Sequence, residues 1–381
     1  MKAASGPTTS RSFVAFVRAE YPFFIGLTTA VTFLALGNQI LEDVAHPLLV
    51  SAIFVVLLAA VLWSAVAVVR HADCLAVKCR EPYGTLILTL SAISIEVVMI
   101  SAAMLHGANN PTLARDMMFG VVMIALNGLV GFSLLLGGLR HHEQNYNLQG
   151  ASAYLNTIMA LVVLGLVLPN FTTSLSGPRL SSVQEIFLVV TSLSLYVIFL
   201  FIQTGRHRQY FKEAAGAPLT TAGGHHSPSS LRSTGFHTAM LFLYLIVVVV
   251  LAEKFAIPLD NCIERLGMPQ AFGGAIVAGL VLTPEAMSAV KAARANQLQR
   301  SVNILHGSVL ASIGLTIPAV LVIGMTTNRQ VMLGIEGGNL PLLVLTLGAS
   351  VVTFGSGKTN VLQGCVHLVL FAVFLLLIFC P

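Results

Sequence analysis

Two glutamates stand alone inside long apolar segments of the sequence. Glu96 lies within residues 88–101, and Glu285 lies within residues 279–290. No Lys or Arg lies within one helical turn of Glu96, so an ion pair along its own helix does not explain this charge. Carboxylate oxygens are the ligands that hard cations prefer, and the same oxygens also take up protons. A cation and a proton would compete for these two groups, which is the simplest physical basis for exchanging one for the other.

Polar residues near the two glutamates are candidates to complete such a site. Pro284 precedes Glu285 and removes a backbone N–H, so a local helix break there would free carbonyl oxygens to coordinate an ion. The hydroxyl and amide groups on the same and the following apolar segments are Ser94, Asn127, Thr283, Ser288, Ser308 and Ser312. Each of them also fits an ordinary hydrogen bond between helices. His306 and His367 are candidates either for moving protons or for helix packing.

The composition explains why internal carboxylates indicate function. Of 381 residues, 56% are hydrophobic and only 9% are charged, whereas soluble domains carry roughly 25% charged residues. The mean hydropathy is +0.87, so the solvent for most of the surface must be lipid. A charge inside a bilayer costs at least a few kcal/mol and is therefore usually functional. The alternative is a structural pair of protonated glutamates, hydrogen-bonded inside the helix bundle.

Other classes of protein are poorly matched. The formal charge of +5 comes from scattered residues that form no basic patch, so nucleic acid is not an expected partner. Residues 354–359 resemble half of a phosphate-binding loop, but Val352 occupies the position of its first glycine. No grouping of nucleophile, base and oxyanion donors is present, and the cysteines form no metal-binding pattern. We therefore expect no enzyme activity and no cofactor.

The apolar segments predict an all-α integral membrane protein with about 11 transmembrane helices, since a spanning helix needs about 20 apolar residues. The predicted ranges are 22–41, 47–69, 83–106, 116–138, 150–169, 184–204, 235–253, 268–290, 301–325, 331–354 and 361–380. With this count, fifteen of the twenty Lys and Arg residues fall on the side of the N-terminus. The positive-inside rule then places the N-terminus in the cytoplasm and the C-terminus on the external, periplasmic side.

A polar segment divides the chain into two similar halves. Residues 205–234 are rich in Gly and Pro, include His225 and His226, and are expected to form a flexible cytoplasmic linker. The two histidines fit a metal or pH-sensing pair as well as a solvated pair on a loop. We expect residues 1–21 to form a cytoplasmic tail and 22–46 an extra N-terminal helix. The repeats would be residues 47–204 and 235–381, with five helices each.

Two consecutive halves with five helices each must have opposite orientations in the membrane. This inverted-repeat architecture is common in secondary transporters, whose binding sites lie at the repeat interface near the bilayer midplane. Glu96 falls on the second helix of the first half, and Glu285 falls on the second helix of the second half. The prediction is that both carboxylates meet at one site.

Several segments in order, from about residue 24 to residue 379, resemble the calcium/cation antiporter superfamily, in particular its cation/proton exchanger branch. The bacterial subgroup that exchanges sodium and calcium, and also potassium, for protons is the most similar. The segments that carry the resemblance are residues 80–91 leading to Glu96, 128–138, 282–285, 296–300, 307–312 and 357–364. The resemblance implies a fold of ten core helices with one additional N-terminal helix.

The resemblance also implies roles for individual residues. The family has a conserved glutamate in a Gly-Asn-x-x-Glu pattern in each repeat, and these glutamates correspond to Glu96 and Glu285. The Gly-Asn pair is replaced here by Ala92-Ile93 and by Val281-Leu282. A Gly-Ser pair expected on the next helix is present as Gly307-Ser308, but the first half has Gly120-Val121.

The sequence therefore predicts a secondary active transporter of the bacterial cytoplasmic membrane. It would exchange cytoplasmic Ca2+ or Na+, and K+ as a further candidate, for external protons by alternating access around Glu96 and Glu285. Its partners would be the transported ions and the lipid bilayer. The alternatives are a cation channel, another proton-coupled transporter and, much less compatible with the residues, a membrane-embedded enzyme.

Overall fold

The computed structural model describes residues 17–42, 47–79, 83–106, 110–212 and 232–380. Over these ranges the chain is almost entirely helical. The only strands among them are β1 (Gln144–Asn145) and β2 (Lys358–Thr359), which pair antiparallel. Most of the predicted tail at 1–21 and most of the predicted linker at 205–234, including His225 and His226, lie outside the described residues.

The first half of the chain contains the helices up to Phe211, several of which change type along their length. η1, η2 and η4 are π-helical, whereas η3 and η5 are 3-10 helices. The elements are α2 (Tyr21–Glu42), α3 (Pro47–Cys79), α4 (Tyr83–His106), α5 (Leu113–Met123), η1 (Ile124–Leu129), α6 (Val130–His141), α7 (Leu148–Val162), η2 (Val163–Val167), η3 (Leu168–Phe171), α8 (Ser182–Phe201), η4 (Ile202–Arg206) and η5 (Arg208–Phe211).

The second half follows a similar plan, and here η7 is a π-helical segment between two α-helices. The elements are α9 (Thr234–Arg265), α10 (Gln270–Arg294), α11 (Leu298–Ala311), η7 (Ser312–Thr316), α12 (Ile317–Thr327), α13 (Asn339–Thr353) and α14 (Val361–Phe379).

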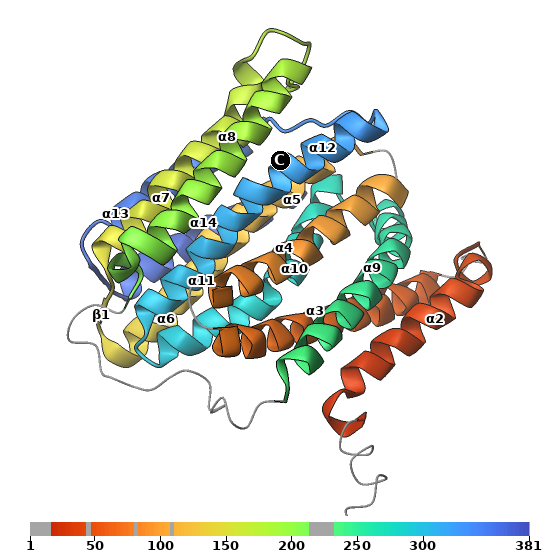
Figure 1. The fold of residues 1–381 in the computed structure, drawn as a ribbon. Helices are drawn as coiled ribbons and strands as arrows, with labels where there is room; N and C mark the ends of the chain where they lie inside the picture. Colours follow the sequence, from red (N-terminus) through yellow and green to blue (C-terminus); the bar gives the residue numbers. More distant parts are fainter. Residues whose placement is uncertain (1–16, 43–46, 80–82, 107–109, 213–231, 381) are drawn as a thin grey trace, which may run out of the picture.

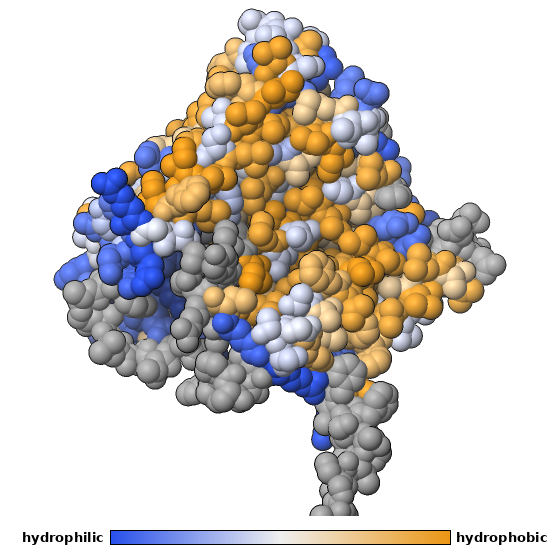
Figure 2. Space-filling model, in the orientation of Figure 1, coloured by the Kyte–Doolittle hydropathy of each residue, from blue (hydrophilic) through white to orange (hydrophobic). Residues whose placement is uncertain are grey.

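Eight helical segments of the described residues are long and apolar enough to cross a bilayer. They are Ser51–Ala76, Leu113–His141, Leu148–Phe171, Ser182–Arg206, Thr234–Arg265, Gln270–Arg294, Leu298–Thr327 and Val361–Phe379. Three apolar helical stretches are shorter, namely Tyr21–Leu36, Leu90–Ala102 and Asn339–Thr353. Hydrophobic residues cover much of the visible face, with hydrophilic residues gathered toward its edges (Figure 2). The chain is therefore a helical membrane protein, and the count of eleven spans stays a prediction.

The predicted helix at 331–354 is wrong in its first part. α13 begins only at Asn339, and the preceding residues form an extended segment. The amide of Met332 donates to the carbonyl of Pro111, and the amide of Ile335 donates to the carbonyl of Leu166, each at 2.9 Å. Gly337 adopts a left-handed φ of 60°, which favours glycine and interrupts a helix. These apolar residues are buried by contacts from other helices rather than by a helix of their own.

Helices that are distant in the sequence lie side by side. α3 packs along α9, and α2 packs against both of them, at the right of Figure 1. α10 packs against α5 and α11, whereas α14 packs against α6. α4 contacts α3, α9 and α10, so it lies between the α2–α3–α9 group and the rest of the bundle. This arrangement places the helix of Glu96 next to the helix of Glu285.

The contact between α6 and α14 requires glycine at Gly364. A Cβ at this position would lie 2.7 Å from the backbone nitrogen of Leu135 and 2.9 Å from the carbonyl oxygen of Gly131. We expect Gly364→Ala to lower the free energy of unfolding by about 1–3 kcal/mol, since backbone atoms must move to admit the methyl group. Thermal unfolding of the purified protein measures the effect.

Gly348→Ala is the matched control for this substitution. Gly348 is also in a helix interior, but nothing lies within 4 Å of a Cβ built there. Alanine favours a helix over glycine by about 1 kcal/mol, so this variant should be unchanged or more stable. An equal loss of stability in both variants would show that close contact at Gly364 is not the cause.

Glu20 links the start of α2 to α3 and α9. Its side chain is buried and accepts hydrogen bonds from Arg70, from Nε2 of His71 at 3.2 Å and from the Tyr244 hydroxyl at 3.2 Å. Nδ1 of His71 in turn lies 3.0 Å from Nδ1 of His237, so one of the two nitrogens donates to the other. Burial raises the pKa of Glu20, but the hydrogen bond from His71 and the charge of Arg70 outweigh it, and the pKa lies below its ordinary value.

Glu20→Gln should therefore destabilise the protein in a pH-dependent way. A carboxyl group whose pKa is depressed on folding adds stability above its unfolded pKa, about 4.3, and this stability is lost as the pH falls through the folded pKa. The difference in melting temperature between wild type and Glu20→Gln should be largest near neutral pH and should shrink toward about pH 4. A difference that stays constant over this range would contradict the role of the ionised carboxylate.

Candidate functional site

Glu96 lies in the middle of α4 with its side chain almost fully buried, at 1% exposure. Its Oε2 accepts a hydrogen bond from the Ser312 hydroxyl at 2.5 Å. Its Oε1 is buried and has no hydrogen-bond partner among the described residues. Thr316 approaches the same carboxylate without forming a well-oriented hydrogen bond. Glu96 therefore keeps one acceptor oxygen available inside the bundle.

Glu285 lies on α10, which packs against α4. The residue is half-buried, and its Oε2 is buried without a hydrogen-bond partner in the described part of the chain. Glu96 and Asp73, the latter on α3, both lie close enough to Glu285 to interact with it electrostatically. The structure thus brings the two predicted glutamates close enough to interact, each with one unpaired oxygen. Asp73 was not predicted, because α3 continues beyond the apolar residues that defined its expected end at residue 69.

A π-helical segment interrupts the span that follows each glutamate helix. η1 contains Asn127, and η7 contains both Ser312 and Thr316. Glu285 lies 189 residues after Glu96, and Thr316 lies 189 residues after Asn127. π-Helical turns are rare and occur frequently at functional sites, because they disturb the regular backbone ladder. The two segments therefore occupy matching positions relative to the glutamates.

Asn127 lies at about the depth of Glu285, because α10 runs alongside the span that contains it. In that pair of helices, a Cβ at Gly274 would meet the backbone of Asp116 and Met117, and Ala286 shares a groove with Leu129. The buried Asn127 amide donates to the Thr346 hydroxyl at 2.8 Å and its Oδ1 pairs with Nδ1 of His367 at 3.0 Å. Its side-chain groups are thus engaged with α13 and α14.

His367 extends this buried hydrogen-bonded chain toward the loop that carries β2. Its Nε2 lies 3.0 Å from the Thr353 hydroxyl. The Tyr146 hydroxyl donates to the Thr353 carbonyl at 3.4 Å and accepts from the Gly357 amide at 2.9 Å. Asn127 and His367 were candidate residues in the sequence, whereas Thr346, Thr353 and Tyr146 were missed. The only feature of the sequence that could have indicated any of them is that Thr346 and Thr353 share one face of an apolar segment, two helical turns apart.

His306 is fully buried on α11 but makes no hydrogen bond to either glutamate. Its Nδ1 donates to the Val302 carbonyl at 3.1 Å, and its ring packs edge-on against Phe354 with centroids 4.8 Å apart. Its Nε2 is buried without a partner among the described residues. His306 lies near His367 and packs against Phe354, which directly follows Thr353, so it borders the chain around Asn127 and His367.

The remaining candidate residues lie on the helices of the glutamates or on α11. Ser94 donates to the Leu90 carbonyl at 2.6 Å, and Thr283 donates to the Gly279 carbonyl at 2.7 Å, both within their own helices. Ser288 lies one turn after Glu285, and Ser308 lies one turn before Ser312. The predicted break at Pro284 is wrong, because α10 is continuous from Gln270 to Arg294. Pro284 still deprives the Leu280 carbonyl of its intrahelical donor, while packing by neighbouring helices maintains the helix.

The donors present suit a hard cation. No group of three His, Cys, Asp or Glu side chains that could hold a resident metal occurs in the described ranges. Two carboxylates, hydroxyl groups and backbone carbonyls provide oxygen ligands instead, which Na+, K+ or Ca2+ would accept. Carboxyl groups also take up protons, so the same two side chains are the candidates for both cation and proton binding.

Ionisable residues enclosed by apolar membrane helices are typical of proteins that move ions or protons. The sequence model of the family described as "Sodium/calcium exchanger protein" matches residues 49–205 and 236–380. The chain belongs to this family, which confirms the resemblance seen in the sequence, and it is an ion transporter rather than an enzyme.

Relatives agree with this assignment. The chain is 45% identical over 313 residues to y4hA of Sinorhizobium fredii (strain NBRC 101917 / NGR234), covering 81% of this chain and 83% of that protein. It is 39% identical over 330 residues to the sodium-potassium/proton antiporter ChaA of Escherichia coli (strain K12), covering 87% and 89%. The solved structure of native YfkE shares the fold, with a TM-score of 0.72 at 20% identity, covering 94% of this chain and 100% of that one.

Proposed function

We propose that this protein exchanges cytoplasmic Na+, K+ or Ca2+ for external protons. The observation that carries the proposal is the pair Glu96 and Glu285, two interacting carboxylates inside a bundle of apolar helices, each with an unpaired oxygen. The similarity to a sodium-potassium/proton antiporter supports Na+ and K+ as substrates, and the family's description supports Ca2+.

Competition for the same oxygens is the proposed coupling mechanism. When the carboxylates are ionised, they bind a cation together, with hydroxyl groups, carbonyls or water completing its shell. When protons bind, the negative charge that attracts the cation is lost. Ser312 takes part by donating to Oε2 of Glu96, which favours the ionised form and leaves Oε1 toward the ion. Thr316, Ser94, Thr283, Ser288 and Ser308 are the further hydroxyl groups available on these helices.

Alternating access would follow from two inverted five-helix repeats at residues 47–204 and 235–381. In support, the family's sequence model matches two separate segments, and one spacing of 189 residues relates Glu96 to Glu285 and Asn127 to Thr316. The extra helix at 22–46 corresponds to α2, which packs on the outer side of α3 and α9. With an odd number of eleven spans, the N-terminus is cytoplasmic and the C-terminus is periplasmic in a bacterial cytoplasmic membrane.

The buried chain from Asn127 to Tyr146 is proposed to position η1 beside Glu285. Asn127 is held from two sides by Thr346 and His367, so the π-helical segment is fixed to α13 and α14. A rigid second layer of this kind keeps a binding site at its working geometry. His306, whose buried Nε2 has no hydrogen-bond partner among the described residues, borders this chain and is a candidate proton acceptor beside it.

Proton movement in everted membrane vesicles tests the proposal. A pH-sensitive dye should report proton efflux from acidified vesicles when Na+, K+ or Ca2+ is added, and vesicles without the protein should give no such response. If none of the three cations moved protons, the exchange function would be wrong. A cation channel would be recognised by cation flux that continues unchanged when no pH gradient is present.

A further inference from the structure

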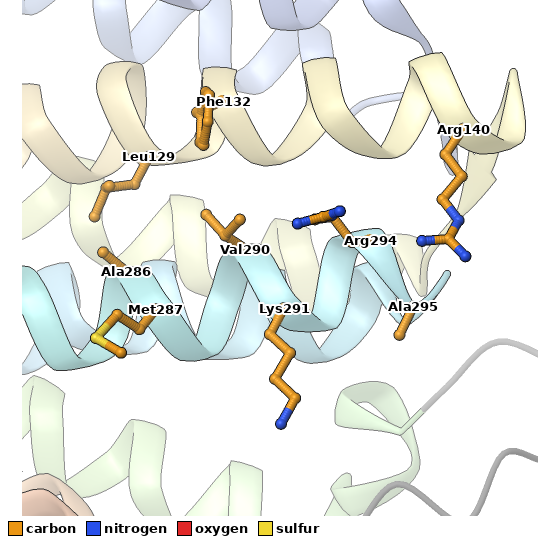
Figure 3. Close-up of a pocket in the computed structure, with 9 residues that line it drawn as sticks. All are labelled: Leu129, Phe132, Arg140, Ala286, Met287, Val290, Lys291, Arg294 and Ala295. Carbon is orange, nitrogen blue, oxygen red and sulfur yellow. The ribbon is translucent and has the colours of Figure 1, made fainter.

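An open groove lies between α6 and α10, beside the residues that follow Glu285. It encloses about 710 Å³ and is lined by Leu129, Phe132, Arg140, Ala286, Met287, Val290, Lys291, Arg294 and Ala295. Figure 3 shows the apolar residues Leu129, Ala286 and Val290 toward one end of the groove and the basic residues Arg140 and Arg294 toward the other. The groove is therefore divided along its length into an apolar part and a cationic part.

The cationic part lies where both helices end. Arg140 is in the last turn of α6, and Lys291 and Arg294 are in the last turn of α10. All three side chains are exposed, and none of them makes an ion pair with another described residue. No acidic residue lines the groove. Asp73, which interacts electrostatically with Glu285, does not line the groove, and the positive charge that acts on it is that of Arg300.

The apolar part lies deeper along the same two helices. Phe132 and Met287 are 44% and 63% exposed although they belong to candidate membrane spans. Exposed apolar groups at this depth must face lipid tails or another apolar ligand. The distance along the helices from Ala286 to Arg294 is eight residues, or about 12 Å at 1.5 Å per residue, which is a substantial part of one bilayer leaflet.

We propose that this groove binds one anionic phospholipid, with its phosphate between Arg140, Lys291 and Arg294 and an acyl chain along Leu129, Phe132 and Val290. A transported cation is a poor occupant, because three positive charges without a lining carboxylate repel it. Basic pockets between transmembrane helices are suited to acidic lipid headgroups, and arginine pairs well with phosphate oxygens. The lipid would sit directly beside Ala286 and Met287, next to Glu285.

Native mass spectrometry of the delipidated, full-length protein tests this site with phosphatidylglycerol as the probe and phosphatidylcholine as the uncharged reference. Wild type should bind one phosphatidylglycerol in preference to phosphatidylcholine. Arg140→Gln combined with Arg294→Gln should weaken phosphatidylglycerol binding by about ten- to thirty-fold, since each basic residue contributes about 1 kcal/mol near an anionic surface. Phosphatidylcholine binding should not change.

Two further variants make the test specific. Arg206→Gln with Arg208→Gln removes two exposed positive charges outside the groove and should retain wild-type phosphatidylglycerol binding. Val290→Phe fills the apolar part, leaves every charge in place and should also weaken phosphatidylglycerol binding. The proposal is overturned if the Arg140/Arg294 variant binds phosphatidylglycerol as wild type does. It is also overturned if glycerol phosphate, which has the headgroup without acyl chains, displaces the lipid at equal concentration.

Discussion

Replacing either Glu96 or Glu285 with glutamine should nearly abolish cation-driven proton movement. Glutamine preserves the size of the side chain but can neither carry the charge nor bind and release a proton. Two unit charges about 4 Å apart interact by about 4 kcal/mol at an effective dielectric constant of about 20, and 1.4 kcal/mol corresponds to tenfold in affinity. We therefore expect the initial rate of exchange to fall by about tenfold or more, with Ca2+ affected most because it carries two charges.

Cation-dependent proton flux in vesicles with matched amounts of protein measures this loss. Both variants should reach the membrane at normal levels, because removing a buried charge does not hinder insertion. Glu143→Gln is the control, since Glu143 is exposed and pairs only with the exposed Lys358 at 3.4 Å among the described residues. If either glutamine variant retained wild-type exchange of Na+ and Ca2+, that glutamate would be structural and the shared site would have to be abandoned.

The two glutamates could be predicted from the sequence because an ionisable residue in an apolar segment is conspicuous. The cost of a buried charge is a local property, so no knowledge of the fold is needed to recognise it. Most of the helical segments are predictable for the same reason, as each is defined by its own apolar residues. The helix ends are less predictable: α3 and α9 continue to Cys79 and Arg265, well past the ends at residues 69 and 253 that their continuous apolar runs predicted.

The partners of the glutamates depend on tertiary structure and could not be predicted. Ser312 was one of several candidate hydroxyl groups, and nothing local links it to Glu96, which lies 216 residues away. Thr316 has only its position one turn after Ser312 as a signal. The π-helical segments η1 and η7 are likewise invisible in the sequence, because an extra residue in a helical turn is stabilised by packing rather than by composition.

The error at Pro284 has a similar origin. A proline in a helix removes one hydrogen bond and usually bends or breaks the helix. Here α10 remains continuous, since it is packed against α5, α11 and α4 along its length. The only consequence of Pro284 for the hydrogen bonds of α10 is that the Leu280 carbonyl has no donor within the helix. Contacts with neighbouring helices therefore keep α10 continuous at Pro284, where the local preference of proline alone predicted a break.

Removing the hydroxyl of Ser312 should shift the pH dependence of exchange toward alkaline pH. Ser312 donates to Oε2 of Glu96 at 2.5 Å, and a hydrogen bond to an ionised group is worth about 1.5–3 kcal/mol. Without this donor the ionised carboxylate is less stable relative to its protonated form, so the cation must compete with a more tightly held proton. One pH unit corresponds to 1.36 kcal/mol, and we expect Ser312→Ala to shift the midpoint of the pH profile upward by about one unit or more.

The measurement is the initial rate of cation-driven proton movement across a range of pH at one fixed, sub-saturating Na+ concentration, for variants present at equal levels. Ser312→Thr keeps a hydroxyl at this position and should restore most of the wild-type profile, which a purely structural effect of the alanine would not explain. Ser101→Ala removes a hydroxyl from the same helix as Glu96, where it bonds to the Val97 carbonyl, and should leave the profile unchanged. An unshifted profile in Ser312→Ala would show that this hydrogen bond does not control the proton affinity of Glu96.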